Sequence, residues 1–257
     1  MTPTLWLSLS LVGCDAFRKA FDTVEGLTES TVVQGAVLGI DVPDDPNLAA
    51  LLEGTDFAPG TAVTAFVVDA TSVADLAEAP VDDATVAVVG SVDEAVPSQG
   101  DGLYANDPST SDLVYVDGDQ WTMSVTRGDA VGEVALALPA GADVAIPTQH
   151  SAGTPLVIDL SGQGFGSAIG VVVDATGEVV WTNVPTDVRS LYDAMGSGDV
   201  STLDIPGSAF AANQVYLVGV AAMAHTDADD LEGVNTALSK VRVGKMFLSP
   251  VTTASIP

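Results

Sequence analysis

Short runs rich in Val, Ile and Thr recur along the chain from residue 31 onward, separated by Gly, Pro and Asp. Such runs favour β-strands, and the separating residues favour turns. The strands expected from this pattern are residues 31–42, 62–69, 84–89, 113–116, 120–126, 133–138, 156–160, 168–174, 178–182, 202–205, 214–221 and 240–248. Many short strands at this spacing predict an all-β protein built from β-sandwiches.

A few segments depart from the strand pattern. Residues 46–53 and 188–195 are expected to form short helices, the second with Asp187 as its N-cap. Residues 15–29 carry apolar side chains at a spacing that suits a short amphipathic helix or a tether. Two segments, residues 116–120 and 174–178, have the composition of hairpin turns.

A repeated segment indicates two related units. Residues 66–71 match residues 171–176 at five of six positions, and the offset from 66 to 171 is 105 residues, about the length of one sandwich domain. Residues 139–154 are mostly small, contain Pro and Gly, and are nearly uncharged, which is typical of a linker. We therefore expect two tandem β-sandwiches, at residues 30–148 and 149–257.

In the first unit, four segments carry a recognisable pattern: residues 32–37, 79–88, 101–104 and 118–125. With these segments the unit resembles a carboxypeptidase-regulatory-like or transthyretin-like domain. The second unit resembles an immunoglobulin-like or fibronectin-like sandwich. These folds host many functions, so the resemblance implies architecture only.

The N-terminus has an apolar run, residues 5–13, that ends at the only cysteine of the chain, Cys14. The run is shorter than the roughly 20 residues that span a bilayer, and it suits a signal peptide. Residues 11–14, Leu-Val-Gly-Cys, resemble the lipobox of bacterial lipoproteins. The resemblance implies a signal peptide at residues 1–13, fatty acyl chains such as palmitate on Cys14, and a tether at residues 14–29. It also implies a membrane-anchored protein of the bacterial cell envelope that faces the periplasm or the cell exterior.

The charge balance is strongly acidic, with 35 Asp and Glu against 7 Lys and Arg, a formal net charge of −28. Repulsion at this net charge opposes the compact state, and salt screens it. Asp-rich, Lys-poor surfaces resemble those of halophilic proteins. Nucleic acid is not expected as a partner, because no basic stripe exists to neutralise phosphates.

Acidic loops are the best candidates for a metal site. Asp227, Asp229, Asp230 and Glu232 lie close together in the sequence, and residues 41–47 form a second acidic segment. Calcium binds six to eight oxygen ligands, which such loops supply. Neither segment has the spacing of an EF-hand, and chance clustering in an Asp-rich chain is the alternative.

Other candidates have simpler interpretations. His150 and His225 lie in loop-like sequence without a second His or Cys at ligand spacing, so exposed loop positions are favoured, although a Ser–His–Asp triad stays open. The Arg-Gly-Asp tripeptide, residues 127–129, suits a hairpin turn. Lys240, Arg242 and Lys245 form a basic cluster that could contact an anionic glycan or a lipid headgroup, but pairing with the protein's own carboxylates is favoured. Residues 240 and 242 share one face of the expected strand.

Together these features predict a lipid-anchored cell-envelope protein with a structural, adhesive or ligand-presenting role and no catalysis. Its expected partners are the membrane and, beyond it, envelope proteins or glycans. No cofactor is expected. Two alternatives stay open: an envelope hydrolase with an unrecognised site, and a calcium-dependent adhesion or binding module.

Overall fold

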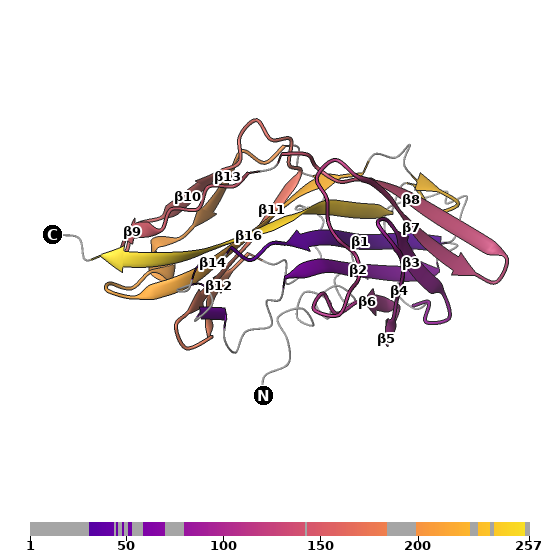
Figure 1. The fold of residues 1–257 in the computed structure, drawn as a ribbon, viewed down its shortest axis with the longest axis horizontal. Coiled ribbons are helices and arrows are strands. Elements are labelled where there is room, and N and C mark those ends of the chain that lie inside the picture. Colours follow the sequence, from indigo (N-terminus) through magenta and orange to yellow (C-terminus); the bar gives the residue numbers. More distant parts are fainter. Residues whose placement is uncertain are drawn as a thin grey trace, which may run out of the picture.

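The computed structural model describes residues 31–43, 45, 48, 51–52, 59–69, 80–141, 143–183, 199–226, 231–236 and 239–254. Within them nearly all regular elements are β-strands, which confirms the all-β part of the prediction (Figure 1). The strands are β1 (Thr31–Ile40), β2 (Gly60–Asp69), β3 (Thr85–Val89), β4 (Asp93–Val96), β5 (Ser98–Gly100), β6 (Leu103–Ala105), β7 (Gln120–Arg127), β8 (Ala130–Ala137), β9 (Gln149–Ser151), β10 (Leu156–Asp159), β11 (Ser167–Asp174), β12 (Val179–Thr182), β13 (Thr202–Ile205), β14 (Val215–His225), β15 (Leu231–Glu232) and β16 (Lys240–Ala254). A 3-10 turn, η2, covers Gly207–Ala209.

Nine strands form one large sheet in the order β12–β11–β14–β16–β1–β2–β6–β5, with β9 beside the end of β16. A five-stranded sheet, β15–β8–β7–β3–β4, packs over one part of it, and a two-stranded sheet, β10–β13, packs over the other. In Figure 1, the yellow strand β16 runs along the long axis of the molecule and connects these two parts.

The central strand of the large sheet is β16. On one side it pairs antiparallel with β14, from Arg242 to Thr252. On the other side it pairs in parallel with β1 over seven residue pairs, from Lys240 to Met246. Strands on both sides of the predicted domain boundary at residues 148 and 149 therefore belong to one sheet. The boundary itself stays a prediction.

Alternation along the strands divides the apolar residues into three cores. The first lies between the large sheet and the five-stranded sheet, and includes Val37, Val63 and Val243. The second lies under β10 and β13, and includes Val172 and Val251. The third covers the opposite face of the large sheet; its residues come from both parts of the chain, among them Leu38, Leu48, Val171, Leu217 and Leu248.

One predicted strand, residues 113–116, is wrong. Its backbone groups bond to side chains instead of a neighbouring strand: the Thr61 hydroxyl donates to the Leu113 carbonyl, and the Val114 N–H donates to the Ser91 hydroxyl. The predicted turn at residues 174–178 does join two strands, β11 and β12.

The helix predictions are only partly within the described residues. Leu48, Leu51 and Leu52 have helical backbone inside the predicted helix 46–53, and Leu48 is fully buried in the third core. The predicted helix 188–195 and its N-cap Asp187 lie outside the described residues, as does the tether 14–29.

Candidate functional site

The large sheet has an open edge in its middle. The pairing of β1 with β16 ends at Met246, and that of β9 with β16 begins only at Thr252. β1 and β9 lie on the same side of β16, because β14 occupies the other side. Among the described strands, nothing pairs with residues 247–251 on that side.

The backbone groups at this edge follow from the alternation of the strand. The Thr252 N–H donates to the Thr148 carbonyl on the open side, at 2.9 Å. Every second residue directs its N–H and C=O to the same side, so Leu248 and Pro250 face the opening. Pro250 has no N–H, and proline in a sheet is confined to positions where no ladder bond is needed. The edge therefore offers the N–H and C=O of Leu248; the C=O of Pro250 faces the same side but already accepts a long bond, 3.4 Å, from the Ser249 hydroxyl.

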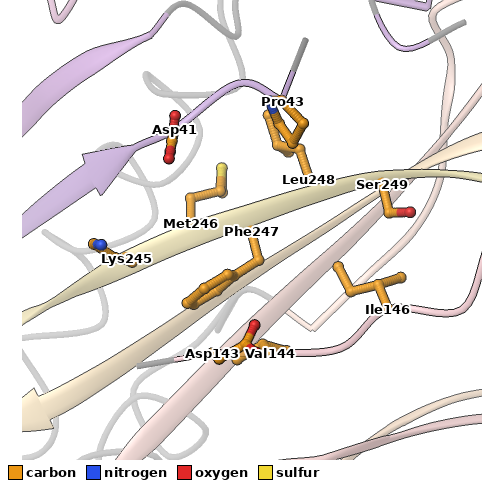
Figure 2. A pocket seen from close by; sticks show the side chains of 10 residues that line it. All are labelled: Asp41, Pro43, Asp143, Val144, Ile146, Lys245, Met246, Phe247, Leu248 and Ser249. Carbon is orange, nitrogen blue, oxygen red and sulfur yellow. The ribbon is translucent and has the colours of Figure 1, made fainter. Parts of the chain in front are cut away.

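A pocket of about 280 Å³ lies at this edge. Figure 2 shows its lining: Asp41 and Pro43 follow the end of β1, Asp143, Val144 and Ile146 belong to the connection toward β9, and residues 245–249 of β16 form the floor. Met246 and Leu248 belong to the third core, whereas Phe247 packs against the second. A pocket that meets side chains from both faces of a strand lies at the edge of that strand.

The charge at the pocket is mainly negative. Asp41 and Asp143 are exposed at its two sides. The Gln163 side chain fixes the position of Asp143, because it accepts the Asp143 N–H at 3.1 Å and donates to the Asp143 carbonyl at 2.6 Å. Both bonds use the backbone of Asp143 and leave its carboxylate to the pocket.

Lys245, which lines the pocket, is already paired. Lys245 Nζ lies 2.5 Å from the Asp117 carboxylate and 5.5 Å from the centre of the Tyr115 ring. Burial, and then the charge of Asp117, raise the pKa of Tyr115 far above its ordinary value. Pairing with the protein's own carboxylate, favoured from the sequence, is thus confirmed for Lys245.

Most of the residues predicted to bind calcium lie outside the described residues: Asp227, Asp229 and Asp230. Glu232 is described, is exposed on β15, and lies opposite Glu133 of β8. Within the described parts of the chain, no group of three or more His, Cys, Asp or Glu could hold a metal ion. Calcium binding by this loop stays a prediction.

Both histidines lie in strands rather than loops, which corrects the expectation from sequence. His150 is half-buried on β9; its Nε2 lies 2.8 Å from the Thr154 carbonyl oxygen, and its ring packs edge-on against Phe210. His225 is the exposed last residue of β14. The second core therefore accounts for the environment of His150.

In the Arg-Gly-Asp tripeptide, Gly128 and Asp129 form the turn between β7 and β8, as expected, and Arg127 is the last residue of β7. The guanidinium of Arg127 pairs with Asp69 and, at 3.4 Å, with Asp83.

The predicted basic cluster is divided between the two faces of β16: Lys240 and Arg242 share one face, whereas Lys245 lies on the other. Burial lowers the pKa of Arg242 to about 10.

Cys14, the predicted lipidation site, lies outside the described residues. No helix within the described ranges is long and apolar enough to cross a membrane. The pocket was not predicted from the sequence, because its residues come from three separate segments. Pro250 could have indicated it, because a proline within a strand is confined to positions where no neighbouring strand needs its N–H.

No protein-family model matches the chain, and no curated protein matches it. The solved structures that resemble it distantly include the following three. The FN1–FN3 domains of chicken CNTN1 are 10% identical over 77% of this chain and 64% of theirs, with a TM-score of 0.24. The BSP domain of a biofilm-associated protein is 13% identical over 88% of this chain and 30% of its own, with a TM-score of 0.23. The four N-terminal Ig domains of Dscam1 isoform 1.9 are 11% identical over 69% and 39%, with a TM-score of 0.18. The chain spans less than two thirds of the length of each.

Proposed function

We propose that this chain is a non-catalytic, load-bearing binding protein of a bacterial cell envelope, held to the membrane by a lipid on Cys14. The sequence Leu11-Val12-Gly13-Cys14 supports the anchor. The observation that carries the load-bearing role is the parallel pairing of β1 with β16.

The geometry of this pairing suits a tethered protein. The tether enters β1 at Thr31, at the end where β16 begins, and β16 runs parallel to β1 away from it. Tension between the anchor and anything held near the C-terminal end of β16 pulls the two strands in opposite directions along their length. All seven residue pairs then share the load, since none can separate before the others.

The environment of His150 supports a non-catalytic role over a hydrolase. A general base must be within hydrogen-bonding reach of the proton that it abstracts. His150 Nε2 instead lies against the Thr154 carbonyl, and its ring packs on Phe210.

The anchor is tested by mass spectrometry of the mature N-terminal peptide from bacterial membranes. A lipid adduct on Cys14 is expected, and Cys14→Ala should move the protein to the soluble fraction. An unmodified peptide that spans Gly13 and Cys14 in the mature protein would refute the anchor.

A further inference from the structure

We propose that the open edge of β16 is a binding site for an extended peptide segment that carries alternating apolar side chains and at least one Lys or Arg. The inference deepens the proposed function by naming a ligand class, and it rests on that function only for its biological setting. The site consists of residues 247–251 with Asp41, Asp143 and Ile146 around them.

The backbone supplies the first argument. An unpaired strand edge is a template for another strand. Here the opening is bounded at both ends, by the pairing of Ile40 with Met246 and by that of Gln149 with Thr252. Five residues of β16 lie between those limits, about 17 Å of strand. A segment of three to five residues fits this length, whereas a long sheet edge of another protein does not.

The side chains supply the second argument. A strand added at this edge points alternate side chains to opposite faces. One set meets Phe247 and Ile146, and the other meets Met246 and Leu248. Apolar side chains at every second position of the added strand would therefore be buried against an existing core, whichever of the two faces they meet.

The negative charge around the pocket favours a positively charged ligand. Asp41 and Asp143 flank the pocket, and Lys245 is neutralised by Asp117. With a net charge of −28, the whole protein attracts basic segments and repels acidic ones. A Lys or Arg beside the apolar positions of the ligand completes the match.

The test uses the full chain in detergent and a fluorescent peptide, Lys-Val-Thr-Val-Lys, capped at both ends. We expect saturable binding by fluorescence anisotropy and a loss of about tenfold in affinity on Asp41→Asn with Asp143→Asn. The matched control, Asp129→Asn, changes a charge at the remote β7–β8 turn and should leave affinity unchanged. A peptide with Glu in place of both Lys should not bind.

Amide hydrogen exchange distinguishes strand addition from simple charge attraction. The peptide should slow exchange at the Leu248 N–H, which faces the opening, and leave Phe247 and Ser249 unchanged, since their N–H groups face β14. Absence of saturable binding, binding indifferent to Asp41 and Asp143, or binding without protection of Leu248 would each overturn the proposal.

A second peptide, with the sequence of residues 15–24 of this chain, tests self-recognition. If it protects Leu248 more strongly than the first peptide, the assignment of the edge to a separate partner is wrong. None of these outcomes bears on acylation of Cys14, so failure here is distinguishable from failure of the anchor.

Discussion

Glu133 of β8 lies directly opposite Glu232 of β15 in an antiparallel pair, and both residues are exposed. Like charges at facing positions oppose strand pairing. The five-stranded sheet thus ends on a two-residue strand that is held against electrostatic repulsion. The repulsion expected from the acidic composition can therefore be measured at this one pair of residues.

Glu232→Gln should stabilise the protein at low salt, by about 0.2–1 kcal/mol, because it removes one of the two facing charges. The gain should disappear in about 1 M sodium chloride, where the screening length is about 3 Å. Chemical unfolding at the two salt concentrations measures it, with Asp129→Asn as the control. Equal gains from both variants would show that net charge, not this pair, is responsible.

The whole protein should also gain stability as sodium chloride is added, most steeply below about 0.3 M, where screening changes fastest. Thermal unfolding at constant pH tests this. If calcium is the reason for the acidic loop around Glu232, calcium at fixed ionic strength will raise the midpoint and magnesium will not replace it. A midpoint unaffected by sodium chloride would contradict the screening argument.

Glu94 should make stability sensitive to acid. Burial alone would raise its pKa, but bonds donated by the Asn106 amide, the Ser111 hydroxyl and the Asp112 N–H outweigh burial and lower that pKa. A lowered pKa in the folded state gives stability that is present above the ordinary Glu pKa, about 4.3, and is lost as the pH falls through the lowered value.

Glu94→Gln should therefore be less stable than the natural chain at pH 7 and approach it as the pH falls toward 2.5. Urea midpoints across this range measure the difference. The loss should exceed that of Asp129→Asn, since Asn106 also accepts the Val63 N–H and so connects Glu94 of β4 to β2. A pH-independent difference would mean that Glu94 acts only through packing.

The backbone of Gly39 packs closely against the ring of Tyr115, which borders the first core. A Cβ atom at this position would lie 2.5 Å from Cγ of Tyr115. Gly39→Ala should destabilise the protein by about 1–3 kcal/mol, the usual cost of overpacking. In a Tyr115→Ala background the cost of the same change should fall, and a double-mutant cycle by urea unfolding measures the coupling. Additive effects would show that the ring moves aside freely.

The sequence was sufficient for most strands, because Val-rich runs bounded by turn residues need only local information. The repeated segment also has a structural counterpart: Val67 of β2 and Val172 of β11, which are 105 residues apart, are both buried in cores on the same side of the large sheet. The sequence did not predict that β16 would continue from 248 to 254. Ser249 and Pro250 interrupt the apolar pattern there, and pairing with β14 maintains the strand.

The candidate site could not be predicted, since it is defined by where partners stop. Ile40 ends β1 opposite Met246, and Gln149 begins β9 opposite Thr252. These limits depend on contacts between segments more than 100 residues apart, which local patterns do not encode. The sequence shows that Asp41 and Asp143 are charged, but it does not show that both lie beside β16.

The parallel pairing of β1 with β16 predicts a mechanical response that depends on direction. In a Cys14→Ser background, cysteines at Thr31 and Ala254 allow the two strands to be pulled in shear. Cysteines at Thr31 and Lys240 pull the same ladder from one end, so that its residue pairs open one after another.

The rupture force in single-molecule pulling should be at least about twofold higher in shear, because the hydrogen bonds of all seven pairs must then break together. Val37→Pro should lower the shear force, because the Val33 N–H donates to the Ser239 hydroxyl on the β16 side and every second N–H of β1 faces the same way. Equal forces in the two directions would remove the load-bearing role and leave the anchor and the binding edge to stand on their own evidence.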